Sequence, residues 1–219
     1  MKRKVIRMVS LLLTLILLCT GCVTPKKIST LFPHYEELSA LIGLTMDEAL
    51  EKMGWQEEDV PERWNLTYDI PVEAEISGVP VSVMCVFLEK LTTIDYLAEF
   101  PDDMENAMKD TLRIIGEIGS ALGEKVTWSD TEIDMFHITE AELQEIVEGR
   151  RFNKIQLQWD LSSAASSSTK KYMKELKEEP GYIMDPMYSL TLTLSRVEDT
   201  VYLRLSVGVH YDMSSAIKN

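Results

Sequence analysis

The sequence predicts an α+β fold, an antiparallel β-sheet with one long amphipathic helix packed on one face and shorter helices beside it. Several neighbouring segments alternate apolar and polar residues, which is the pattern of half-buried strands. Residues 103–122 instead repeat their apolar residues every three or four positions, as an amphipathic helix does. Groups of adjacent strands separated by a helix favour α+β over a parallel α/β sheet.

Two short helices are expected first, at residues 34–42 and 46–53. Thr45 and Glu48 have the spacing of a capping box at the start of the second helix, and Gly54 ends that helix. The acidic stretch that follows, residues 56–64, is expected to form a solvated loop.

Three strands should complete the N-terminal half, at residues 65–76, 81–88 and 91–100. Pro71 lacks a backbone N–H, so the first strand is expected at a sheet edge or with a bulge.

The helix at 103–122 is predicted to bury one continuous stripe, formed by Met104, Met108, Leu112, Ile115, Ile118 and Leu122. Gly116 and Gly119 weaken a helix, and we expect them to allow close packing on the sheet.

The C-terminal half should contain an extended segment at 126–136, a helix at 141–148 capped by Thr139 and Glu142, and a strand at 152–161. Residues 162–181 are predicted to be a low-complexity, charged insertion with a surface helix at 170–179. A hairpin at 190–209 turns at Glu198 and Asp199, and its alternation should leave one sheet face wet.

A helix followed by a hairpin occurs in each half, with Trp55 and Trp128 each after a helix. In element order alone this resembles the internal duplication of β-lactamase inhibitor proteins and of small outer-membrane assembly lipoproteins. A single domain over residues 31–219 is the preferred interpretation.

The first 21 residues have the order of an export signal: a basic start, an uncharged apolar run at 8–18, and small residues before Cys22. The apolar run is too short to span a bilayer. The ending resembles the lipobox of bacterial lipoproteins, although Cys19 stands where that family usually has Leu. The resemblance implies a signal peptide at 1–21, lipidation (palmitate) of Cys22, a tether at 22–30, and attachment to the outer face of the cell membrane.

The chain is strongly acidic, with 22 basic and 36 acidic residues. Four basic and no acidic residues precede Cys22, so the mature chain would carry a formal net charge of −18. This charge repels phosphate backbones and predicts no nucleic-acid partner. It also leaves the lipid, rather than a basic surface, to hold the membrane.

The sequence predicts no catalytic, metal or cofactor-binding residues. The three histidines lie far apart, and the calcium-like start Asp130-x-Glu132-x-Asp134 lacks the glycine and glutamate that should follow. No Gly-rich phosphate loop is present, and Ser168-x-x-Lys171 is discounted because it lies in the low-complexity stretch. Cys85, inside an apolar strand, is expected to be a buried inert thiol.

Two functions remain open from the sequence. The preferred one is a non-enzymatic, lipid-anchored module that binds a protein or envelope component. The alternative is an envelope hydrolase, for example one acting on glycan, with a site built from dispersed carboxylates; a two-lobed solute receptor is disfavoured by the short chain. The four tryptophans are candidates for lining a groove or for the edge of the core: Trp55, Trp64, Trp128 and Trp159.

Overall fold

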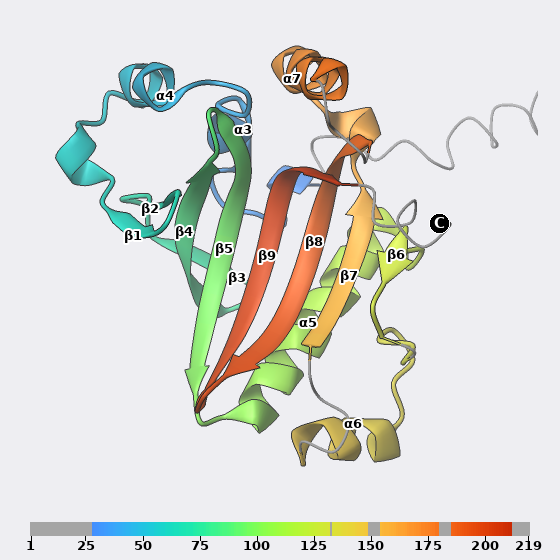
Figure 1. The fold of residues 1–219 in the computed structure, drawn as a ribbon. Coiled ribbons are helices and arrows are strands. Elements are labelled where there is room, and N and C mark those ends of the chain that lie inside the picture. The colour runs from blue at the N-terminus through green and yellow to red at the C-terminus, as the bar shows by residue number, and fades with distance from the viewer. Residues whose placement is uncertain (1–27, 132, 149–153, 180–184, 212–219) are drawn as a thin grey trace, which may run out of the picture.

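The computed structural model of the protein describes residues 28–131, 133–148, 154–179 and 185–211 (Figure 1). Within these ranges the chain combines a nine-stranded antiparallel sheet with helices, which confirms the α+β class. The strands are β1 (Glu62–Trp64), β2 (Thr67–Asp69), β3 (Ala74–Ile76), β4 (Val79–Phe87), β5 (Leu91–Pro101), β6 (Trp128–Ser129), β7 (Lys154–Asp160), β8 (Pro186–Val197) and β9 (Thr200–Tyr211). The helices are α3 (Tyr35–Ser39), α4 (Met46–Met53), α5 (Met104–Leu122), α6 (Glu140–Val147) and α7 (Ser167–Glu178), with short 3-10 turns at Glu57–Asp59 and Ser162–Ala164.

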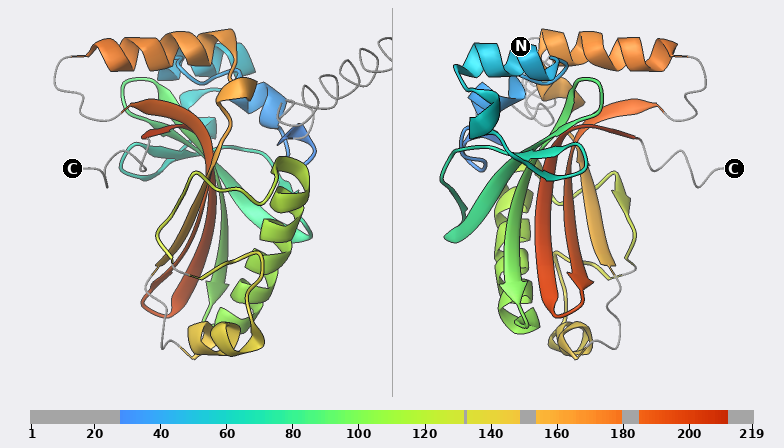
Figure 2. Two further views of the ribbon diagram at one scale, coloured as in Figure 1. Left: turned by 90° about the vertical axis from the view of Figure 1, so that its right-hand side faces the viewer. Right: turned by 60° about the vertical axis from the view of Figure 1, so that its left-hand side comes forward.

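The sheet joins the two halves of the chain in the order β1-β2-β4-β5-β9-β8-β7-β6, with β3 pairing to β4. The central contact is β5 with β9, in register from Thr93–Gly208 to Pro101–Thr200. Figures 1 and 2 show α5 lying against one face of the sheet, with α4 and α7 at one end and α6 at the other. The opposite face of the sheet carries no helix along most of its length in the described part of the chain.

Local signals placed most helix ends correctly. Thr45 and Glu48 form the predicted capping box of α4, and Thr139 and Glu142 form that of α6. Gly54 adopts the left-handed conformation that ends α4. The first predicted helix is shorter than expected, because only Tyr35–Ser39 is α-helical.

Three predicted extended or loop segments differ in the structure. The strand expected at 65–76 is split around Pro71 into β2 and β3, which both pair with β4. Part of the expected acidic loop forms the edge strand β1. Of the described residues between 126 and 136, only Trp128–Ser129 is a strand.

Side-chain hydrogen bonds explain why 126–136 is not extended. Ser129 Oγ accepts from the backbone N–H of Thr131 at 3.2 Å, and Thr131 Oγ1 accepts from that of Ile133 at 3.2 Å. Asp134 Oδ1 accepts from Phe136 N–H at 3.0 Å. Such local bonds offer the backbone turns in place of a strand ladder.

The buried face of α5 contains four of the six predicted stripe residues, Met104, Met108, Ile115 and Ile118, and extends to the side of Ala107, Thr111 and Ile114. Thr111 and Ile114 are buried with Ile115, whereas Leu112 and Leu122 are only half-buried. The prediction that Gly119 lets the helix pack closely on the sheet was wrong. A Cβ at Gly119 would meet the Phe136 ring at 2.8 Å, so this glycine instead leaves room for an aromatic side chain from a loop. The Phe136 ring in turn packs edge-on against Trp159.

Much of the predicted insertion at 162–181 is helical over its described residues, which end at 179. Ser166 caps α7, which begins inside the serine-rich stretch, and Thr169 and Tyr172 are buried. Tyr172 packs on Gly43, where a Cβ would meet the tyrosine Cβ at 2.9 Å. Among the described residues, no helix has the length and apolarity needed to cross a bilayer.

Candidate functional site

A groove of about 810 Å³ runs along the sheet face opposite α5, and we call it the open-face groove. The side chains of β8 alternate between the two faces of the sheet. Leu190, Leu192 and Leu194 are buried toward the core, and the hydroxyl side chains of β8 lie on the face of the groove. The residues that line it are Trp64, Val86, Leu88, Thr92, Thr93, Leu97, Lys154, Gln156, Gln158, Leu176, Pro186, Thr191, Thr193, Ser195, Val197, Tyr202, Arg204, Ser206, Val209, His210 and Tyr211.

Strand register sets the floor of the groove in cross-strand rows. One row runs from Gln158 on β7 through Thr191 on β8 and Ser206 on β9 to Asp95 on β5. The next row contains Gln156, Thr193, Arg204 and Leu97. Successive rows lie about 7 Å apart, because side chains on one face of a strand recur every second residue.

Asp95 anchors this floor although it is fully buried, with 0% of its surface exposed. Its carboxylate accepts hydrogen bonds from Arg204 Nη2 and from Ser206 Oγ, on the neighbouring strand β9. A buried charge is tolerated when an opposite charge and hydrogen bonds satisfy it, and Asp95 has both.

The contacts of His210 fix which ring nitrogen carries its proton. His210 Nε2 lies 3.1 Å from Ser206 Oγ, and Nδ1 lies 2.9 Å from Ser189 Oγ. Because Ser206 gives its own proton to Asp95, its oxygen must accept, so Nε2 carries the hydrogen. Nδ1 then accepts from the hydroxyl of Ser189, which itself accepts from Gln158 Nε2 at 3.0 Å. The result is one directional chain from Gln158 to Asp95.

This chain holds His210 neutral. Burial lowers the pKa of His210 to about 4, against the opposing attraction of the Asp95 carboxylate. Ser189 resembles an activated nucleophile only in having a histidine partner, because it is fully buried and its oxygen already accepts from Gln158. The arrangement therefore stiffens the groove floor and offers no exposed nucleophile there.

Two polar atoms in the groove are buried without a hydrogen-bond partner in the described part of the chain: Gln158 Oε1 and Thr191 Oγ1. These residues are 2% and 5% exposed and stand opposite each other in register. The orientation of the Gln158 amide is fixed, because its Nε2 also donates to the carbonyl of Tyr211 at 3.3 Å. Unsatisfied buried polar atoms are rare in folded proteins, and a water or ligand commonly completes them.

Apolar side chains from three separate elements form the walls of the groove. Trp64 on β1 is 47% exposed, Leu88 in the β4–β5 turn is 53% exposed, and Leu176 comes from α7. Exposed large apolar residues gathered around a hollow mark a binding surface more often than scattered ones do.

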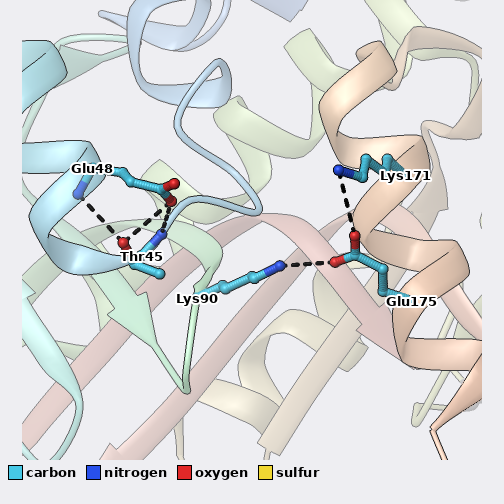
Figure 3. Close-up of polar contacts among 5 residues, drawn as sticks. All are labelled: Thr45, Glu48, Lys90, Lys171 and Glu175. Carbon is cyan, nitrogen blue, oxygen red and sulfur yellow. Dashed lines mark hydrogen bonds and ion pairs between the residues drawn. The ribbon is translucent and has the colours of Figure 1, made fainter.

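Figure 3 shows how α7 is held beside this wall. Lys90, from the β4–β5 turn, donates to Glu175 at 2.8 Å, and Lys171 lies 3.8 Å from the same carboxylate. Lys90 also lies 5.7 Å from the centre of the Tyr172 ring. Together with Tyr172 on Gly43, these contacts position α7 at the end of the groove.

The groove differs in charge from the acidic chain around it. None of its lining residues is Asp or Glu, whereas Lys154 and Arg204 both line it. The acids beside it already have partners: Asp95 binds Arg204, Glu99 binds Arg63, and the Asp130 carboxylate accepts from Gln156 N–H. Lys154 influences Asp130 electrostatically, but no described residue forms an ion pair with it.

The structure brings few of the sequence-derived candidates together. Cys22, the predicted lipidation site, lies outside the described residues. Cys85 is buried as predicted, and burial raises the pKa of its thiol. Of the four tryptophans, one lines the open-face groove and three do not. Trp64 is the lining residue, Trp159 is buried in the core, Trp55 packs against the core, and Trp128 is half-buried on β6.

The polar candidates are also dispersed. Ser168 lies on α7, outside the helix expected at 170–179, and bonds Ser166, whereas Lys171 lies on this helix as expected and pairs with Glu175. Asp134 pairs with the exposed His137, which raises the pKa of that imidazole. In the ranges described, no three His, Cys, Asp or Glu residues are grouped to hold a metal ion.

Sequence reasoning missed the residues that make the floor of the groove. A signal was present in β8, where Ser189, Thr191, Thr193 and Ser195 alternate with leucines, and in Asp95, a lone acid within an apolar strand. Comparison with known proteins gives no match to a family model, to a curated protein or to a solved structure.

Proposed function

We propose that this protein is a lipid-anchored, extracytoplasmic module of the bacterial cell envelope that binds its ligand in the open-face groove and carries out no reaction. The order of the first 22 residues supports the anchor, because it resembles a lipoprotein signal ending at Cys22. The acidic composition supports the expectation of no nucleic-acid partner.

One observation carries the binding part of this proposal: the groove combines apolar walls with two buried polar atoms that no described residue satisfies. Ligand sites are usually mainly apolar hollows with a few placed polar groups. The absence of carboxylates from the lining, and the burial of Ser189, make this groove better suited to binding than to hydrolysis.

We also propose that α5 is the one long amphipathic helix expected from the sequence and that it serves as the support of the sheet. Its residues Ile114, Ile115 and Ile118 are buried. By covering one face of the sheet, α5 leaves the other face available for the ligand (Figure 2).

The alternative, an envelope hydrolase with dispersed carboxylates, would use a second hollow. Asp69, Glu73 and Glu75 line this more open space of about 590 Å³. Asp69 is ion-paired with Arg63 at 3.3 Å, and the hollow lacks the buried unpartnered atoms that mark the open-face groove within the described residues. These differences favour binding in the open-face groove.

The proposal is tested by photo-crosslinking in living cells. A photoreactive phenylalanine analogue replaces Leu88, an exposed wall residue of the groove, and in a second strain replaces Lys109, which is exposed on α5. We expect an envelope component to be attached at position 88 and not at position 109. Equal labelling at both positions, or no adduct at position 88, would contradict the proposal.

A further inference from the structure

We propose that the open-face groove binds a small organic acid, with one carboxylate or phosphate group, an adjacent O–H or N–H donor, and an apolar body. This inference rests on the proposed binding function and specifies the ligand of the same groove. It follows from three features of the groove: its charge, its unpartnered polar atoms and its apolar walls.

The charge of the groove selects an anion. Arg204 uses Nη2 to bind Asp95, which leaves other N–H groups of its guanidinium facing the groove, and its side chain is 44% exposed. Lys154 lines the groove two rows from Thr191 and has no ion-pair partner among the described residues. With no acid in the lining, and with the buried Asp95 carboxylate already paired with Arg204, an anionic oxygen in the groove meets hydrogen-bond donors.

The unpartnered atoms place a second requirement on the ligand. Thr191 Oγ1 has no hydrogen-bond partner among the described residues and can donate to an oxygen of the ligand. Arg204 stands one row away on the adjacent strand, so we expect that oxygen to belong to the anionic group. Gln158 Oε1 is an acceptor only, and its amide cannot rotate without placing oxygen against the Tyr211 carbonyl. A ligand that satisfies both atoms therefore carries a donor next to its acid group.

The remainder of the groove favours an apolar body of small-molecule size. Trp64, Leu88 and Leu176 line its walls, and a volume of about 810 Å³ lies in the range of small-ligand sites. A long polyanion does not suit it, because the surrounding chain is acidic.

The test uses the full-length acylated protein in nanodiscs of phosphatidylcholine and isothermal titration with three probes. N-acetyl-phenylalanine presents a carboxylate beside an amide N–H, 2-hydroxyphenyl phosphate presents a phosphate beside an O–H, and N-acetyl-phenylalanine amide is uncharged. We expect at least one anion to bind with a dissociation constant of ~1 mM or tighter. We expect the amide to bind at least about tenfold more weakly, because it lacks the charge-assisted hydrogen bonds. The two anions distinguish a carboxylate ligand from a phosphate ligand.

Two groove variants and a matched control sharpen the result. Thr191→Val removes an unpartnered hydroxyl, so the fold should be unaffected, and it should weaken anion binding by about fivefold. Lys154→Met should also weaken it by several-fold, whereas Lys174→Met removes the same charge from α7 outside the groove and should leave it unchanged.

Failure of both anions to bind, equal binding of the amide, or unchanged binding by Lys154→Met would overturn the proposed ligand class. Crosslinking at position 88 that persists despite such a failure would show that the groove binds another ligand. Probe binding without crosslinking at position 88 would instead contradict the binding function in the envelope.

Discussion

The hydrogen bonds around His210 determine which of its ring nitrogens carries the proton. Ser206 gives its proton to Asp95 and therefore accepts from His210, while Ser189 supplies the hydrogen on the other side. A neutral imidazole with its hydrogen on Nε2 satisfies both ring nitrogens, because Nδ1 then accepts from the Ser189 hydroxyl, although backbone hydrogen bonds to Gly208 and Ser189 favour the protonated ring. Burial disfavours the charged ring and lowers the pKa of His210 to about 4.

This neutrality predicts how stability depends on pH. Between pH 6.5 and 4 the unfolded chain takes up a proton at His210 that the folded chain does not, so the free energy of unfolding falls as the pH falls. The loss should level off below about pH 4, after reaching about 3 kcal/mol. Urea denaturation at pH 7 and pH 4.5, followed by circular dichroism, measures it.

The variant His210→Gln should be less stable at pH 7 but should lose less stability than the natural protein on acidification. His137→Gln, which changes an exposed histidine, should retain the loss. Identical pH dependence in the natural protein and His210→Gln would show that the folded chain protonates this histidine as readily as the unfolded chain does.

Among single residues, the sequence predicted those whose environment is local. Cys85 lies in an apolar run that buries it, and the caps Thr45 and Thr139 depend on a partner three residues away. His210 could not be placed in this way, because the chain of contacts from it reaches Asp95, 115 positions earlier. Only the sheet register brings these residues together.

At the scale of elements, α5 should hold the domain together through its buried face. Ile115 is 1% exposed in the core, so Ile115→Ala should lower the free energy of unfolding by roughly 2 to 5 kcal/mol. Lys109→Ala, on the exposed side, should cost less than about 0.5 kcal/mol. Leu112→Ala should fall between them, because that side chain is only half-buried.

Thermal and urea unfolding of the three variants test this order. Equal losses at Ile115 and Lys109 would mean that α5 does not pack through the face described.

The sequence predicted elements well where one period persists and poorly where side chains bond locally. The β8–β9 hairpin was predicted because its alternation is long and its turn at Glu198 and Asp199 is polar. The stretch 126–136 was misassigned because its Ser, Thr and Asp side chains bind nearby backbone groups. The exact stripe of α5 was missed since Thr111 satisfies its hydroxyl on the Ala107 carbonyl and so can be buried.

At the scale of the whole molecule, the proposed lipid at Cys22 predicts the fractionation of the protein. Each buried methylene contributes about 0.8 kcal/mol to membrane attachment, so two or three acyl chains should hold the protein stably. Cys22→Ser should abolish acyl labelling and either release the protein or leave it unprocessed. Labelling with a radioactive fatty acid, followed by membrane fractionation, measures the outcome.

Cys19→Ser should leave labelling intact, and a Cys22→Ser protein that is still cleaved and acylated would refute the assignment.

The groove, by contrast, was beyond prediction from the sequence. Its floor takes residues from β5, β7, β8 and β9, and the pairing of β5 with β9 joins the two halves of the chain.

The two ends of the sheet have a consequence for association between copies of the chain. β1 has three residues and a register irregularity, and β6 has two, so neither edge offers a long template for strand addition. Beyond β6, the Asp130 carboxylate accepts the N–H of Gln156, while its backbone N–H donates to the Gln156 carbonyl. Both pairing groups of that β7 residue are therefore occupied. Crowded side by side on a surface, neighbouring molecules would therefore find only short strands to pair with at β1 and β6, within the described part of the chain.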